Sequence, residues 1–143
     1  MQTVVPMLAY EDGTAAIEWL TRAFGFRENE PARISENGVV SHAELDVGDG
    51  SLVFLATPTP DYESPKHHRK NCEAARKWSA VPWVIDGLMV QVEDVDAHCS
   101  QARTAGADVL RELEEVEAAG IRLYTAEDLE GHRWMFTQAI GDR

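Results

Sequence analysis

The sequence is short of the features that would assign it a function directly. It has only two cysteines, Cys72 and Cys99, with no CxxC pair, so free thiols in a reducing compartment are expected. It contains no GxSxG, HExxH or glycine-rich phosphate-binding motif. No apolar run approaches the roughly 20 residues of a membrane span, and no basic leader precedes the first apolar residues. We therefore expect a cytoplasmic protein without a membrane partner.

Positive charge is also scarce. The 143 residues include 13 Lys and Arg against 25 Asp and Glu, which gives a net charge of -12. Nucleic acid is thus not an expected partner, because phosphate binding requires a basic surface. The charge either serves solubility or creates a field that attracts cationic ligands. The length corresponds to one domain, or to two small modules that share one core.

An internal repeat organises the chain. The segment "PMLAYEDGTAAIEWLTRA" (6–23) aligns with "LMVQVEDVDAHCSQARTA" (88–105), and each copy reads as a short strand, an acidic turn and a helix. The first helix is predicted from near Thr14 to Gly25. The second is predicted to begin after Asp94 or Asp96, either of which could cap it, and to end at Gly106.

Three extended segments follow each predicted helix. They are 27–34, 41–47 and 51–57 in the first copy, and 109–115, 120–126 and 132–138 in the second. The sequence therefore predicts an α+β fold with a first βαβββ module (1–57), a linker with a short helix (58–87) and a second βαβββ module (88–143). One module of about 60 residues would bury too little apolar surface to be stable alone, so the two modules should form one structural domain. The linker holds two of the four Trp residues and is interpreted as a flap or an interface element.

Several motifs resemble those of a known superfamily. "FGF" follows the first helix, "VEDVDAH" and "ARTAGADV" lie within 92–109, and "YTAEDLEGHRWMF" closes the chain. With the two βαβββ modules, these motifs resemble the vicinal-oxygen-chelate superfamily, and within it the glyoxalase/bleomycin-resistance-like branch. The resemblance implies paired half-barrels around a cleft, usually in a homodimer.

The same resemblance implies four metal-ligand positions in the enzymes of the superfamily. They correspond to Val5, Phe54, Gly87 and Met135 in this sequence. None of these side chains coordinates a hard or borderline divalent ion, and methionine sulfur suits copper(I) instead. We therefore expect no metal at this site, and no metal-dependent chemistry there.

Strand alternation predicts which side chains face the cleft. In the segment 120–126, Ile121 and Leu123 are assigned to the core, so that Arg122 and Tyr124 face the cleft. Apolar residues form the predicted floor and polar residues surround it, which is the usual form of a small-molecule site. The alternative is that these side chains fill a gap or contact another subunit. The predicted ligand-binding residues are Met7, His42, Glu44, Phe54, Trp83, Met89, Gln91, Arg122, Tyr124 and Met135.

Three sets of histidines have alternative interpretations. His42 and Glu44 share a strand face, either as an acid/base pair or half of a metal site, or as a surface ion pair. His132 either takes part in a site or bonds the backbone of its turn. His67 and His68 with Cys72 could suggest a metal, but adjacent histidines on a helix point in different directions, which favours a solvated helix.

The sequence favours a metal-free protein that binds a small molecule, and one role for such a protein is to sequester an aromatic or cationic compound such as an antibiotic. One alternative is a glyoxalase-type lyase or isomerase that holds a divalent metal through His42, Glu44 and His132. A second is a metal-free enzyme with His42 or Glu44 as general base. A third is an interaction module without a ligand. A homodimer is expected because isolated half-barrels leave sheet edges and apolar surface uncovered.

Overall fold

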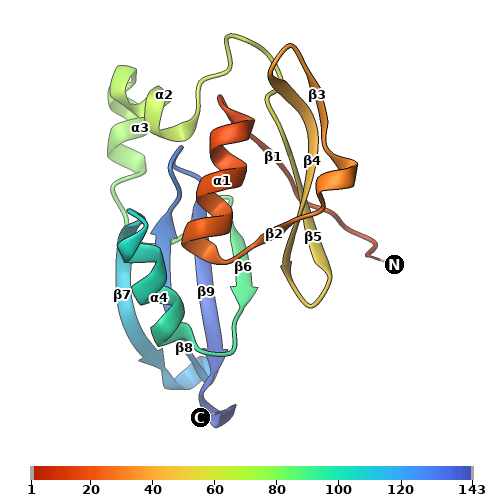
Figure 1. The fold of residues 1–143 in the computed structure, drawn as a ribbon. Helices are drawn as coiled ribbons and strands as arrows, with labels where there is room; N and C mark the ends of the chain where they lie inside the picture. Colours follow the sequence, from red (N-terminus) through yellow and green to blue (C-terminus); the bar gives the residue numbers. More distant parts are fainter. Residues whose placement is uncertain (1, 143) are drawn as a thin grey trace.

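A computed structural model describes residues 2–142 and contains two β-sheets with the same strand order (Figure 1). The order is β1-β5-β4-β2 in the first sheet and β6-β9-β8-β7 in the second, and β3 pairs with β4. In each sheet the module's first strand lies parallel to its last. The strands are β1 (Met7–Ala9), β2 (Arg27–Glu28), β3 (Ile34–Glu36), β4 (Val39–Gly48), β5 (Ser51–Ala56), β6 (Leu88–Gln91), β7 (Asp108–Val116), β8 (Ile121–Glu127) and β9 (Arg133–Ala139). The predicted α+β fold of two βαβββ modules is confirmed.

The two long helices begin at aspartate caps. Asp12 Oδ1 accepts a hydrogen bond from Ala15 N at the start of α1 (Gly13–Phe24). Asp94 does the same for α4 (Val95–Thr104), so Asp94 is the cap of the second helix. Gly25 closes α1 at φ 73°, a left-handed conformation that glycine adopts without strain. The longest helix within residues 2–142 is α1, which at 12 residues is shorter than a membrane span requires.

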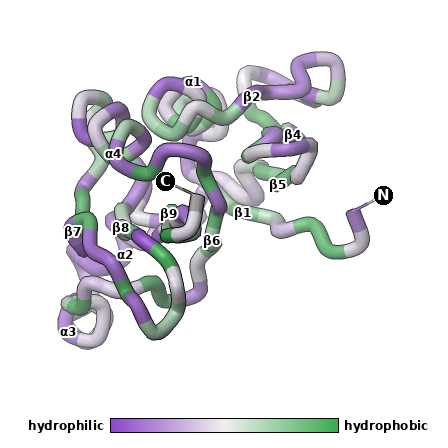
Figure 2. Tube along the Cα trace, turned by 90° about the horizontal axis from the view of Figure 1, so that it is seen from below, coloured by the Kyte–Doolittle hydropathy of each residue, from purple (hydrophilic) through white to green (hydrophobic). Residues whose placement is uncertain are grey.

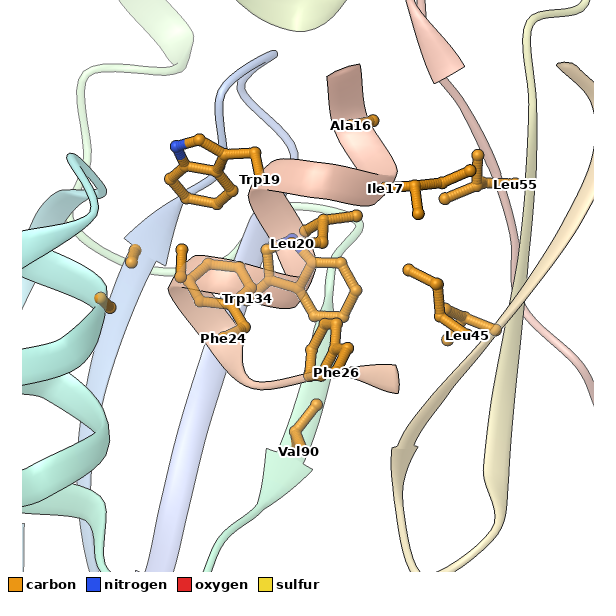
Figure 3. Close-up of a cluster of buried hydrophobic side chains, with 14 of the residues drawn as sticks. Ala16, Ile17, Trp19, Leu20, Phe24, Phe26, Leu45, Leu55, Val90 and Trp134 are labelled. Carbon is orange, nitrogen blue, oxygen red and sulfur yellow. The ribbon is translucent and has the colours of Figure 1, made fainter. Parts of the chain in front are cut away.

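Helix α1 joins the two modules into one core. It lies between the sheets, beside α4 (Figure 1). In Figure 3, Ile17 points toward Leu55 of the first sheet, whereas Phe24 lies beside Trp134 of the second, with 5.7 Å between the ring centroids. Leu20 is fully buried between them. A single helix thus buries two faces at once, and neither sheet has a separate core.

Two predicted elements are divided in the structure. The segment 27–34 contains β2, a 3₁₀ turn (Glu30–Ala32) and the start of β3, because Pro31 has no N–H for a strand ladder. The linker helix is two helices, α2 (Pro65–Asn71) and α3 (Glu73–Trp78). They are separated at Cys72, whose backbone is extended and whose sulfur accepts a bond from Ala75 N at 3.5 Å. Short 3₁₀ turns also occur at Glu117–Ala119 and Ile140–Asp142.

The linker helices and α4 lie on opposite sides of the second sheet. Seen from below, α4 is on one side of β7, β8 and β9, and α3 is on the other (Figure 2). The linker is therefore packed against the sheet face that α1 and α4 leave uncovered. It can bring its own side chains to any site on that face.

Candidate functional site

Each sheet has one face turned toward α1 and α4, and we call the opposite face the open face. In the second sheet the linker covers part of that face. In β6, Val90 is buried while Met89 is 56% exposed, and in β1, Met7 is 79% exposed. In β4, Ala43 and Leu45 are buried on the helix side. A single exposed apolar side chain is common, but exposed apolar residues that adjoin one another mark a surface that receives a partner or a ligand.

Four predicted residues meet on the open face of the first sheet. Met7 and Phe54 are neighbours across the parallel pair β1–β5, and Glu44 lies beside Phe54 across the pair β4–β5. The His42 ring meets the Phe54 ring edge to face at 4.8 Å. His42 Nε2 and Glu44 Oε2 are 2.9 Å apart. The structure therefore places an aromatic ring, a methionine and a polar pair side by side.

The polar pair of His42 and Glu44 retains an unpaired hydrogen-bond acceptor. Glu44 interacts with His42 and accepts a hydrogen bond from Asn29 Nδ2, and the His42 bond in particular lowers the pKa of Glu44. An ionised Glu44 fixes the tautomer in which His42 Nε2 donates. His42 Nδ1 is then an acceptor, and it has no hydrogen-bond partner within residues 2–142. The pair can accept a proton or a hydrogen bond from a ligand. No pattern in the sequence indicates that Asn29 joins this pair.

The second sheet contributes a smaller apolar group. Met89 and Met135 are neighbours across the parallel pair β6–β9, and Gln91 is exposed on β6. Met89 also lines a cavity of about 200 Å³ together with Val4 and Leu52 of the first module. This cavity connects the two modules. Trp83 lies in the linker before β6 and is 56% exposed.

The side chains at the implied metal-ligand positions do not fit a divalent ion. Phe54 and Met135 lie on the open faces, and their strand neighbours are Met7 and Met89 rather than Val5 and Gly87. Neither set supplies oxygen or imidazole donors. Among the residues that the structure describes, no group of three or more His, Cys, Asp and Glu side chains is arranged to hold a metal. His42, Glu44 and His132 therefore do not form the alternative ligand set.

Two predicted ligand-binding residues face the helices instead of the open face. Tyr124 is fully buried, and its hydroxyl is 2.7 Å from His98 Nδ1 of α4. Arg122 donates two hydrogen bonds to Asp96 of the same helix. The assignment failed because Leu123 is apolar but lies on the other face of β8. Tyr124 is the residue that packs inward, since α4 supplies a partner for its hydroxyl.

The turn "DLEG" (128–131) is a structural connection between the modules. Asp128 is fully buried and accepts hydrogen bonds from Tyr10 Oη at 2.6 Å and Trp134 Nε1 at 3.1 Å. Glu130 accepts bonds from the backbone N–H groups of residues 11 and 12, and burial raises its pKa. His132 Nε2 is 2.6 Å from the carbonyl oxygen of Ala9, so the side chain of this histidine bonds β1 rather than the backbone of its own turn. The carboxylates of the turn therefore make hydrogen bonds that stabilise the fold.

A buried ionic group that the sequence did not reveal fixes the linker. Glu127 receives two hydrogen bonds from Arg69 of α2, at 2.6 and 2.7 Å, and one from Arg133 at 3.1 Å. Burial alone would raise the pKa of Glu127, but the hydrogen bonds and charges of Arg69 and Arg133 hold it below its usual value. Arg133 also donates to the carbonyl oxygens of Ser79, Val81 and Trp83. No pattern in the sequence predicts that Arg133 holds the linker in this way.

The remaining sequence candidates have local roles. His67 Nδ1 contacts the Glu11 carboxylate at 3.1 Å, and His68 is exposed on α2. Cys72 and Cys99 are free thiols, as expected. Glu11 also accepts two hydrogen bonds from Ser64, which lower its pKa together with His67. These contacts attach the start of α2 to the first module.

Comparison with known proteins gives a consistent assignment. The model of the Glyoxalase/Bleomycin resistance protein/Dioxygenase superfamily matches residues 3–136. The crystal structure of TioX from Micromonospora sp. ML1 is 33% identical, has a TM-score of 0.69 and aligns over 96% of each chain. No match was found among curated protein sequences.

Two other solved structures are similar in fold at low identity. TnmS3, an antibiotic binding protein from Streptomyces sp. CB03234, is 16% identical, with a TM-score of 0.65 over 96% of this chain and 97% of its own. The fosfomycin resistance protein FosX from Listeria monocytogenes is 12% identical, with a TM-score of 0.64 over 100% and 98%. The matched family model and the identity to TioX confirm the resemblance: the chain belongs to the glyoxalase/bleomycin resistance protein/dioxygenase superfamily.

Proposed function

We propose that the protein is a metal-free binding protein for an aromatic or cationic small molecule, such as an antibiotic. The observation that carries the proposal is the exposed methionine and aromatic surface of the open faces, beside a polar pair with an unused acceptor. Methionine adapts to ligands of varied shape, and aromatic faces attract cations and flat rings. The net charge of -12 favours cations further. TnmS3 is an antibiotic binding protein with the same fold.

The proposal is tested by titrating the protein with planar and cationic antibiotics, including bleomycin-type glycopeptides, while following tryptophan fluorescence. Met7→Lys and Met89→Lys each place a charge on an open face, and Ser100→Lys places the same charge on the exposed surface of α4. Binding should weaken by about tenfold or more in the first two variants, which is about 1.4 kcal/mol, and remain unchanged in the third. If no compound binds below about 100 μM, the sequestration function is wrong.

We also infer that two chains associate through the open faces. Met7 and Met89 expose apolar surface that a partner chain would bury, and obligate interfaces are rich in such side chains. Sedimentation equilibrium should give twice the chain mass of 15.9 kDa at micromolar concentration. A mass equal to one chain would contradict the inference.

The second candidate function is a metal-free enzyme in which His42 is a general base oriented by Glu44. The 2.9 Å contact between them and the unused Nδ1 favour it. It is tested on any compound that the first experiment finds to bind, by following its conversion by mass spectrometry. His42→Gln should then abolish turnover while binding persists. A bound compound that stays chemically unchanged would leave only the binding function.

A further inference from the structure

A second cavity lies between the linker helices and the turn that precedes β9. It has a volume of about 300 Å³, at the lower end of the range for small-molecule pockets. Pro65, Trp78 and Ile85 give it an apolar wall, while His68 and Asp86 provide polar groups. None of the ten binding residues predicted from the sequence lines it. It is therefore separate from the open-face groups on which the proposed function rests.

The wall of this cavity is held in place before any ligand arrives. Arg133 is 7% exposed and donates to three carbonyl oxygens of the loop that follows Trp78. Arg69 binds Glu127 through both terminal nitrogens, which attaches α2 to β8. Lys66 N donates to the carbonyl oxygen of Glu130 at 3.0 Å. A wall fixed at this many points loses little entropy on binding, which favours affinity.

The two arginines of the cavity do not make it an anion site. Every nitrogen of the Arg133 guanidinium already donates within the protein, and the terminal nitrogens of Arg69 are occupied by Glu127. An incoming carboxylate or phosphate would find few free donors.

Cations and hydrogen-bond donors find a different environment. Asp86 lines the cavity and is exposed, and its carboxylate has no hydrogen-bond or ion-pair partner within residues 2–142. Trp78 is 58% exposed and lines the same cavity, so an indole side chain and an unpaired acidic residue border one site. An aromatic face with a carboxylate nearby is suited to a cation carried on a flat ring.

We propose that this cavity binds a planar aromatic cation, with its ring against Trp78 and its positive group at Asp86. Three tricyclic probes of similar size separate the contributions of ring and charge. They are 9-aminoacridine, which is a cation at neutral pH, acridine, which is neutral, and 9-anthracenecarboxylate, which is an anion. Calorimetric titration of the full chain should give the affinity order cation, neutral compound, anion.

Variants then locate the binding. Asp86→Asn should weaken 9-aminoacridine about fivefold and leave acridine unchanged, because only the ion pair is lost. Asn tolerates the positive φ of 49° at this position, so the backbone is retained. Trp78→Leu should weaken both compounds about tenfold. Ile34→Ala is the control, because Ile34 on β3 is as exposed as Trp78, at 58%, and does not line the cavity.

The outcomes separate this inference from the proposed function. Binding that survives Met89→Lys but is lost in Trp78→Leu supports the cavity, whatever binds the open faces. Binding that survives Trp78→Leu and Asp86→Asn but is lost in Met89→Lys places the cation on the open face and overturns the inference. An anion that binds as tightly as the cation, or a failure of all three probes to bind, would also overturn it. Urea unfolding of each variant confirms that it is folded.

Discussion

Asp128 is the residue whose replacement should reveal most about what holds the modules together. Its Oδ2 accepts hydrogen bonds from Tyr10 Oη and Trp134 Nε1, and its Oδ1 accepts three more from the backbone N–H groups of residues 130–132. In Asp128→Asn the amide oxygen can keep the three backbone bonds. The amide nitrogen then faces two donors. Tyr10 can rotate its hydroxyl to accept, but the indole N–H of Trp134 can only donate.

The cost follows from these two bonds. A hydrogen bond to a charged group contributes about 1.5–3 kcal/mol, and a buried donor left unpaired costs about 1–3 kcal/mol. Losing the Trp134 bond and weakening the Tyr10 bond should lower the free energy of unfolding by about 3–4 kcal/mol. This is a large part of the 5–15 kcal/mol typical of a small domain.

Urea unfolding followed by tryptophan fluorescence and circular dichroism measures the change. Tyr10→Phe removes one donor without adding another and should cost about 1–2 kcal/mol. The double variant should cost less than the sum, because the two residues share one bond. Asp61→Asn, at an exposed aspartate, should stay within about 0.5 kcal/mol of the wild type. An Asp128→Asn protein as stable as the Asp61→Asn control would refute the assignment of Asp128 as a structural acceptor.

Three further predictions concern the junctions around this core. Burial lowers the pKa of His98, so the folded protein favours the neutral imidazole. The free energy of unfolding should therefore fall as the pH drops below about 6.5. The thermal midpoint of His98→Gln should change less between pH 8 and pH 5 than that of the wild type. Glu127→Gln should lower the free energy of unfolding, measured in urea at pH 7, by about 3 kcal/mol. The difference from the wild type should shrink as the pH falls below about 4, because a carboxylate whose pKa is lowered in the folded protein contributes stability only above its pKa in the unfolded chain. Gly87→Ala would place a Cβ 2.3 Å from the carbonyl oxygen of Arg133, so it should lower the free energy of unfolding by about 2–3 kcal/mol in the same assay. In the control Gly141→Ala the new Cβ meets no atom within 4 Å, and the free energy of unfolding should not change.

The sequence predicts the helix ends and the strand faces of this protein well, because these features depend on local interactions. Helix caps such as Asp12 and Asp94 act on residues three positions away, and the end of α1 at Gly25 needs only a left-handed glycine. The open-face positions of Met7 and Met89 follow from alternation next to buried neighbours. Each of these assignments depends on a few adjacent residues, and the repeat supplies a second copy that supports it.

The predictions that fail depend on partners distant in sequence. In β8 an aliphatic and an aromatic residue alternate, and periodicity alone does not say which one faces the helix. His98, 26 positions before Tyr124, decides the matter by offering a hydrogen-bond partner on that side. Likewise, Glu127 meets Arg69 across 58 positions, and no local pattern in the linker predicts that contact. Which face of a strand turns toward the helices, and where a linker is attached, are decided by contacts between residues that are distant in sequence.

Polar residues in this protein divide by how much of their hydrogen-bonding capacity the fold uses. Asp128 is the most conspicuous acidic residue of the closing motif, and five donors occupy its two oxygens. His42 and Asp86, in contrast, each keep an acceptor with no partner within residues 2–142. A group whose bonds are all made can hold a structure but has nothing left to offer a ligand, because a new bond must replace an old one. The binding chemistry of this chain should therefore be sought at His42 and Asp86, and mutations in the "DLEG" turn should alter stability before they alter affinity.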